Sequence, residues 1–411
     1  MSLLSIIGSI LQFIIDNKWV ILGYIIIFIL IYINRKKFQI EGKVFFLYKT
    51  KYGVDFINKI ADKNKKLIRI LGYIGIVIGF IGMVLIVGLF FKGIYDLVFN
   101  PGAPAIVSPV IPGVKIPGSS FVVPFGFGIL ALFIVVLFHE FGHGIVARSH
   151  GIKIKSTGVG LLLILPLAFV EPDEKQVVKS KSKIQHSIFA AGPFMNVILA
   201  LLCIALTFIA FPILSSMHHT NGIIFNDIQK GYAADKYGLK LGVPYVMINN
   251  NTINGTTDFI NVMYDLKSNQ TISMTDINNN TITLVTSESP SNKSMAYLGV
   301  MGNDDIFYGL LAKSYDNYII NNSSWIYVST YNVLYFLVEL IGWVYVLSLG
   351  IGLANLLPMG PVDGGRMIHT LMTDFKGKKT GIKIWAIISW LTFIALILLL
   401  IVPILRTVLK I

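Results

Sequence analysis

Long apolar runs recur along this 411-residue chain, and they decide which class of protein it can be. Only 13% of the residues are charged, compared with about 25% in soluble domains. We therefore expect a polytopic α-helical membrane protein with about six transmembrane helices. The expected spans are 19–33, 70–91, 125–148, 184–211, 325–357 and 384–405. The apolar stretch 3–15 is too short to span, and we expect it at the membrane interface or as an extension of the first helix.

The basic residues predict the orientation of these spans. Eleven lysines and arginines but only three acidic residues fall within 35–69, so we expect this basic loop to be cytoplasmic. Such clusters beside apolar runs account for the formal net charge of +13, and no motif with interleaved aromatic residues points to nucleic acid. The N-terminus lacks a basic region and a cleavage motif, so we expect no removable signal peptide. The expected surroundings are the lipid bilayer of the cell membrane.

A polar interval separates two membrane parts. From 212 to 324 the chain is rich in Asn, Thr, Ser and Asp, with short alternating runs such as TITLV that are typical of strands. This length is that of an ordinary domain. We therefore expect a first membrane part at 1–211, an extracytoplasmic insert at 212–324 and a second membrane part at 325–411.

The segment 159–170 is apolar, too short to cross a membrane and interrupted by Pro166. We expect a short re-entrant segment packed against protein, because irregular backbone is not exposed to lipid. Its glycines and apolar residues also suit a strand edge that pairs with an extended peptide. A simple buried loop is a close alternative.

Three titratable residues lie within one apolar run. The stretch 125–150 carries His139, Glu140 and His143 as HEFGH. Residues four apart share a helix face, so both imidazoles can approach one metal ion, and Glu140 stands where it can accept a proton from water. Because titratable groups inside a membrane are costly, they mark a functional site. The alternative is a pair of histidines that only hydrogen-bond inside a helix bundle.

A catalytic zinc keeps three protein ligands, so HEFGH needs a partner. Glu171 and Glu174 follow the motif, but they lie in a lysine-rich segment and are expected in solvent. Asp363 is the better candidate. It lies in NLLPMGPVDGGR (355–366), whose prolines and glycines break the helix at the depth expected for HEFGH. A cage of cysteines is excluded because Cys203 is the single cysteine.

With both motifs in view, the chain resembles the site-2 protease family of intramembrane metalloproteases. The second motif fits the family's NxxPxxxxDG at Asn355, Pro358, Asp363 and Gly364. AGPFMN, which contains Asn196, resembles a third signature, and AFVEPDE (168–174) is similar to archaeal members. In the insert, GYAADKYGLKLGVPYVMINNNTI resembles part of a PDZ domain, with departures at Gly231-Tyr232 and Val243-Pro244.

The resemblance implies a zinc metalloendopeptidase that cleaves within or near transmembrane helices of membrane-protein substrates, in regulated intramembrane proteolysis. It implies one Zn²⁺ per chain held by His139, His143 and Asp363, with Glu140 as general base. It also implies that Asn196 and Asn355 lie near the substrate or oxyanion, that the insert is a PDZ-like α/β domain, and that the re-entrant segment guides unfolded substrate.

Two alternatives use some of the same residues. A metal transporter or sensor would use His139, His143 and Asp363 as a transit site, although no second intramembrane cluster of acids or histidines is visible. An unrelated membrane protease would take Glu171 or Glu174 as its third ligand.

Overall fold

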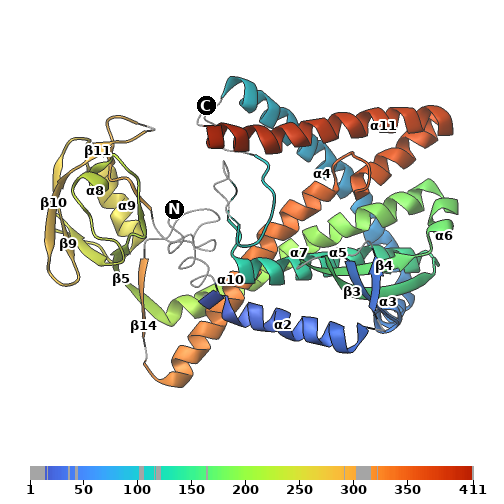
Figure 1. Ribbon diagram of the computed structural model, residues 1–411, viewed down its shortest axis with the longest axis horizontal. Coiled ribbons are helices and arrows are strands. Elements are labelled where there is room, and N and C mark those ends of the chain that lie inside the picture. The colour runs from blue at the N-terminus through green and yellow to red at the C-terminus, as the bar shows by residue number, and fades with distance from the viewer. Residues whose placement is uncertain are drawn as a thin grey trace. The chain divides into compact units, whose positions relative to one another are not determined.

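The structure, a computed structural model, describes residues 14–15, 17–35, 38–41, 45–100, 106–114, 116, 122–162, 165–290, 292–301, 316–321 and 323–409 (Figure 1). Residues 3–13 of the stretch 3–15, which we expect at the membrane interface or as an extension of the first helix, lie outside these residues. The chain divides into two compact units, one made of Met1–Ile204 and Trp343–Ile411, the other of Ala205–Gly342.

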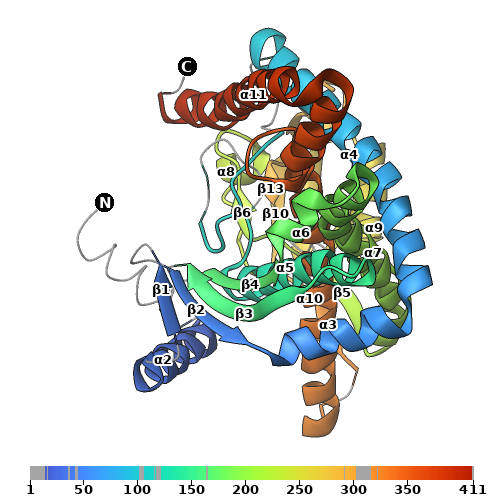
Figure 2. The same ribbon diagram turned by 90° about the vertical axis from the view of Figure 1, so that its right-hand side faces the viewer.

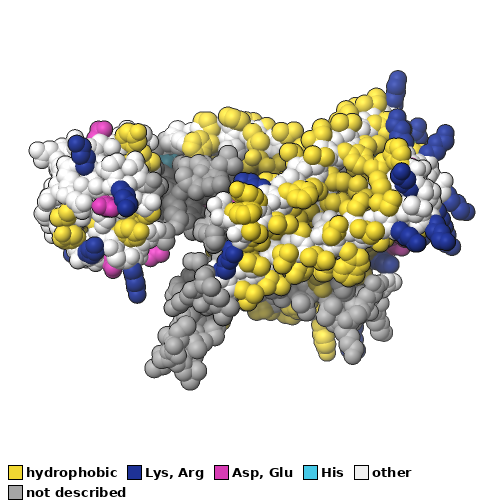
Figure 3. All heavy atoms as spheres, turned by 90° about the horizontal axis from the view of Figure 1, so that it is seen from above, with side chains coloured by type: hydrophobic (Ala, Val, Ile, Leu, Met, Phe, Trp, Pro, Cys, Tyr) yellow, Lys and Arg dark blue, Asp and Glu magenta, His cyan; other side chains and the backbone are white. Residues whose placement is uncertain are grey.

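Five helices of the described chain are long and apolar enough to cross a membrane. They are α4 (Lys65–Phe99), α5 (Phe125–Ser149), α7 (Ser182–Ser216), α10 (Trp325–Asn355) and α11 (Asp363–Leu409). The first expected span is helix α2 (Lys18–Ile33), whose 16 residues reach about 24 Å and fall short of the roughly 30 Å hydrocarbon core. Hydrophobic side chains cover the long helices, and Lys and Arg gather at one end (Figure 3). These features are those of a helical membrane protein.

Helix α5, which carries HEFGH, has a defined end. The N–H of Ile152 donates to Ala147 O and that of Gly151 to Arg148 O, and Gly151 has a φ of 86°. This is the hydrogen-bond pattern of a Schellman motif, which uses a left-handed glycine to satisfy the last carbonyls of a helix. The turn ends α5 shortly after HEFGH and leads the chain into the following strand.

Helix α4 packs through a glycine face. Gly72, Gly75, Gly79 and Gly82 recur at intervals of three or four residues, so they lie on one side of the helix and all are buried. A methyl group on Gly79 would lie 3.1 Å from the Met367 side chain of α11 and 3.2 Å from Ala190 of α7, whereas one on Gly88 would meet nothing. The glycines therefore let α7 and α11 approach α4 closely.

A four-stranded antiparallel sheet lies beside α5, in the order β1-β2-β3-β4 (Figure 2). Its strands are β1 (Phe38–Glu41), β2 (Phe45–Thr50), β3 (Ile154–Leu162) and β4 (Leu165–Pro172). The segment 159–170 is thus most of a β-hairpin, and the alternative of a simple buried loop is wrong. The basic stretch 35–69 is also more than a loop, because it supplies β1, β2 and helix α3 (Tyr52–Lys63).

The remaining elements of the membrane part are a short capped helix, a bent helix and a non-helical connection. After β4, Asp173 caps helix α6 (Glu174–Lys179) by accepting from the N–H groups of Lys175 and Gln176. Helix α11 consists of two helices that meet at Gly377, where φ is 74°. Between α10 and α11, residues 356–362 are not helical, as the prolines and glycines of that stretch predicted.

The second unit holds the polar insert, which is an α/β structure. Its largest sheet has the order β10-β9-β7-β5-β14, with β8 paired to β7, and two short ladders pair β11 with β12 and β13 with β6. The elements are β5 (His218–Ile224), β6 (Asp227–Ile228), α8 (Ala233–Lys236), β7 (Pro244–Ile248), β8 (Asn251–Thr252), α9 (Thr256–Asp265), β9 (Thr271–Asp276), β10 (Thr281–Val285), β11 (Ser287–Glu288), β12 (Ala296–Tyr297), β13 (Val300–Met301) and β14 (Asp316–Ile320). Phe225, Ile248 and Met274 are fully buried in its core.

Candidate metal centre

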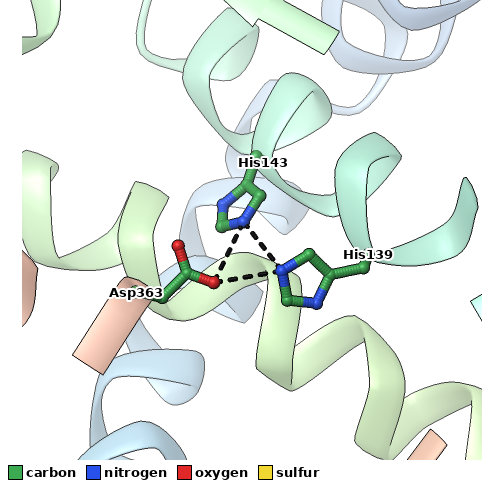
Figure 4. Close-up of side chains that lie close together, drawn as sticks. All are labelled: His139, His143 and Asp363. Atoms are coloured by element: carbon green, nitrogen blue, oxygen red, sulfur yellow. Dashed lines mark hydrogen bonds and ion pairs between the residues drawn. The ribbon is translucent and has the colours of Figure 1, made fainter. Parts of the chain in front are cut away.

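Three ligand atoms converge between α5 and the start of α11 (Figure 4). His139 Nε2 lies 3.0 Å from Asp363 Oδ2 and 3.2 Å from His143 Nε2, and the His143–Asp363 edge is 3.3 Å. Bonds of about 2.0–2.1 Å to zinc place the ligand atoms of a tetrahedral site about 3.3 Å apart. Within the described ranges, this is the one group of His, Cys, Asp or Glu side chains that could hold a metal ion. Donor types and spacing both fit zinc.

A backbone carbonyl orients His143 as a ligand. Nδ1 of His143 lies 2.7 Å from the carbonyl oxygen of Ile188 on α7, and because a carbonyl can only accept, Nδ1 must donate. Nε2 of His143 is then left with its lone pair free for a metal, which is the usual effect of such a supporting bond. His139 is buried, with Nε2 turned toward Asp363 (Figure 4).

Asp363 reaches the histidines because two glycines follow it. It is the first residue of α11, where a carboxylate is favoured by the helix dipole. A Cβ on Gly364 would collide with the backbone carbonyl of Leu356, and one on Gly365 with that of Met359. The two glycines thus let the backbone of the non-helical residues 356–362 pack directly against the first turn of α11.

Helix α7 closes the centre with a residue that has no side chain. A Cβ on Gly192 would lie within 2.5 Å of His139 Nε2 and also against His143 Nε2. Gly142 of α5 permits this proximity, since a Cβ there would lie 2.7 Å from the carbonyl oxygen of Ala191. The space beside the two ligand nitrogens is therefore kept open by glycine, as a site that receives an ion requires.

A cavity of about 810 Å³ opens onto the three ligands. Glu140 lines it beside His139 and His143, together with Phe169, Val170 and Pro172 of β4. The Val170 N–H donates to Glu140 Oε2 over 3.3 Å. The carboxylate next to the first histidine therefore faces the same space as the ligands and touches the last strand of the sheet.

Glu171 and Glu174 also line the cavity, but each has another partner. Glu171 Oε2 accepts from the Ser156 hydroxyl at 2.7 Å and pairs with Lys49 at 3.6 Å. The Ser156 hydroxyl, with Lys49, lowers the pKa of Glu171 and keeps it ionised. Glu174 pairs with Arg366 at 3.0 Å. Neither belongs to the group of ligand atoms, so Asp363 is the third candidate ligand.

The two asparagines have different surroundings. Asn355 ends α10, lines the cavity and donates through Nδ2 to Ile351 O of its own helix. Asn196 is fully buried in α7, and its backbone carbonyl accepts from the Ser348 hydroxyl of α10. A methyl group added at Gly352 of α10 would lie 3.2 Å from the Asn196 Cβ. Asn196 is not among the residues that line this cavity, so its expected role near the substrate stays a prediction.

Sequence reasoning missed three contributors: Gly192, the Ile188 carbonyl and the Val170 N–H. Gly192 carried a weak signal, as a glycine beside a proline inside an apolar span. The other two are backbone groups that any residue would supply, so no residue type reveals them.

The chain is similar to one peptidase family and to several individual proteins. Residues 127–400 match the sequence model of peptidase family M50. Over 200 residues the chain is 33% identical to an uncharacterised protein of Methanocaldococcus jannaschii, covering 46% of this chain and 51% of that protein. Two proteins that carry the provisional name zinc metalloprotease are also similar. The one from Clostridium perfringens is 28% identical, over 32% of this chain and 45% of its own length. The one from Clostridium acetobutylicum is 25% identical, over 68% of this chain and 96% of its own length.

The alignments span about half the length of the first two relatives, whereas the family match covers most of this chain. That match includes HEFGH, Gly192 and Asp363, the residues that build the centre. The chain belongs to peptidase family M50, the site-2 protease family.

Proposed function

We propose that this chain is an intramembrane zinc endopeptidase that hydrolyses peptide bonds within or beside transmembrane helices of membrane proteins. The observation that carries the proposal is the triangle of His139, His143 and Asp363, built on helices of membrane-spanning length with Glu140 beside it. Family membership supports metalloprotease chemistry.

The roles of the residues follow from their positions. His139, His143 and Asp363 would hold one zinc ion, which when bound polarises a carbonyl and lowers the pKa of water. Glu140 accepts the proton of the attacking water and passes it to the leaving amine. The Ile188 carbonyl orients the His143 ring, and His139 and Asp363 are buried, so little reorganisation is needed during the reaction.

The substrate must be extended where it is cut. A helix turns its carbonyls into internal hydrogen bonds, so the scissile bond has to leave the helix before attack. Strand β4 lines the cavity and ends the described sheet, so its outer edge offers main-chain groups to an extended peptide. This is the guiding role expected for the segment 159–170.

The insert is proposed as a PDZ-like domain outside the cytoplasm that screens substrates by their extracytoplasmic parts. Its sheet with helices α8 and α9 supports a peptide-binding fold of this kind. The proposed partners are a transmembrane protein substrate and the bilayer, and the proposed setting is regulated intramembrane proteolysis.

The test compares membranes that contain wild type with membranes that contain Glu140→Gln, by mass spectrometry of the ends of membrane-protein fragments. Asp96→Asn, a carboxylate change on α4 outside the cavity, is the control. Fragments that end inside predicted spans should appear with wild type and the control and be absent with Glu140→Gln. Cleavage at the wild-type rate by Glu140→Gln would reject the mechanism.

Zinc transport is the rival that uses the same ligands. Glu140 contributes no atom to the triangle, so a transporter should keep its zinc flux in Glu140→Gln. Equal zinc flux in the two proteins, with identical fragment sets, would favour transport over proteolysis.

A further inference from the structure

The outer edge of β4 has a fixed pattern of hydrogen-bonding groups. Along a strand, the N–H and C=O of successive residues point alternately to the two sides. The Asp173 N–H donates to Lys153 O, just before β3, so the odd-numbered residues point inward. The Val170 N–H donates to Glu140, on the opposite side, so the even-numbered residues point outward. The register between β3 and β4 is unbroken from Leu162↔Leu165 to Ser156↔Glu171 and shifts between Ser156 and Ile154. The extra residue of this shift lies on β3, so the alternation along β4 itself continues to Asp173.

Two prolines fall on outward positions of the same strand. Pro166 and Pro172 have no N–H, and proline is tolerated on a strand where its nitrogen faces away from the sheet. The outward edge of β4 therefore offers only two N–H donors, those of Ala168 and Val170. An extended chain that pairs with this edge can receive N–H hydrogen bonds from these two residues alone, while its own N–H groups bond to the outward carbonyls of β4.

One of the two donors is already engaged. The Val170 N–H points at the carboxylate of Glu140, and both residues line the cavity. The distance of 3.3 Å lies at the long end for an N–H···O hydrogen bond, since such bonds usually measure about 2.7–3.2 Å. A contact of this length is easily exchanged for a better-placed acceptor, such as the carbonyl of a peptide strand.

We propose that the contact between Glu140 and Val170 is a latch that a docking substrate strand displaces. This inference rests on the proposed function. Without substrate, Glu140 satisfies the open edge and is held away from the reaction. When a substrate carbonyl takes the Val170 N–H, the carboxylate is released toward the scissile bond. The base thereby becomes available when an extended chain lies beside it, and Val170 acts as a positioning residue through its backbone.

Two inactive variants separate the latch from the chemistry. Glu140→Gln keeps an oxygen that can accept from Val170, whereas Glu140→Ala removes the acceptor. Without any substrate, the Val170 amide should exchange with deuterium about three- to tenfold faster in Glu140→Ala, as expected for loss of one hydrogen bond. Equal exchange in the two variants would overturn the proposal. Because this exchange comparison needs no substrate, its outcome does not depend on the proposed function. Failure of the proposed function would appear separately, as absence of cleavage by wild type.

Binding then tests the competition. The probe is a synthetic peptide covering a span that wild type cleaves, and we expect Glu140→Ala to bind it about three- to tenfold more tightly than Glu140→Gln. Adding Val170→Pro to both variants should abolish this difference, because no N–H is left to release. Adding Ala168→Pro should weaken binding in both but preserve the difference, since Ala168 does not hold Glu140.

Each double variant is first checked for its wild-type zinc content, which reports an intact centre. If Val170→Pro does not retain zinc, the exchange comparison of the single variants decides alone. A difference in affinity that survives Val170→Pro would show that Glu140 acts on binding by another route, and the latch would be rejected.

Discussion

A methyl group on Gly192 would occupy the space beside the two histidine nitrogens that face the metal. We therefore expect Gly192→Ala to weaken zinc binding by more than the roughly 10- to 100-fold typical when support of a metal ligand is lost. Gly350→Ala is the control, because a Cβ at that position of α10 meets nothing. Zinc titration of the purified proteins measures the effect. Wild-type affinity in Gly192→Ala would show that the ion binds elsewhere.

In the insert, the Asp276 carboxylate closes the turn between β9 and β10. Oδ1 accepts from the N–H groups of Asn278 and Asn280, and Oδ2 accepts from the Asn280 side chain. The Asn280 side chain, together with these N–H groups, lowers the pKa of Asp276 below its unfolded value. Its contribution to stability is therefore complete above about pH 4 and is lost as the pH falls through the folded-state pKa.

We predict that Asp276→Ala speeds hydrogen exchange across the β9–β10 hairpin in the full-length protein at neutral pH. Wild type should approach the variant as the pH is lowered below about 4, once intrinsic exchange is corrected. A gap between the two proteins that stays constant down to pH 2 would contradict the role given to the ionised carboxylate.

At the scale of residues, the structure brings together the three side chains that the sequence named as candidate metal ligands. HEFGH places two histidines on one helix face wherever the helix lies, and the structure brings Asp363 to them, as the broken-helix motif indicated. Gly192 could not be predicted as a contact, because its role depends on how α7 packs against α5.

At the scale of elements, the buried glycine face of helix α4 determines how closely its neighbours pack. Gly79→Val would press against Met367, which lies one turn after Asp363 on α11. Overpacking of this kind costs about 1–3 kcal/mol, so we expect lower thermal stability together with weaker zinc binding. Gly88→Val on the same helix should leave both unchanged, because that position is open. If the two variants behave alike, the glycine face does not position α11.

Helices and strands differ in how far local sequence determined them. The long helices follow from apolar runs, since each satisfies its backbone within itself. The four-stranded sheet does not, because β2 pairs with β3 about one hundred residues later. The lysines that indicated a cytoplasmic loop at 35–69 also obscured the aromatic strand FFLYKT. The segment 159–170 is apolar on both faces, so it lacks the alternation of a half-buried strand.

For the whole molecule, the basic clusters predict that the insert and the lysines near Gly377 lie on opposite sides of the membrane. In a Cys203→Ala background, Asn278→Cys should react with a membrane-impermeant thiol reagent in intact cells. Lys378→Cys should react only after the cells are opened. Both positions are exposed, so accessibility within the protein does not limit labelling. Labelling of both in intact cells would contradict the predicted orientation.

Zinc content per chain tests whether His139, His143 and Asp363 form the catalytic metal centre. It would be measured on purified wild type, Asp363→Ala, Glu171→Ala and Glu140→Gln. We predict one zinc per chain in wild type, in Glu171→Ala and in Glu140→Gln, and loss of zinc in Asp363→Ala, because three protein ligands are needed to hold a catalytic zinc. Zinc that stays with Asp363→Ala but is lost from Glu171→Ala would contradict this centre.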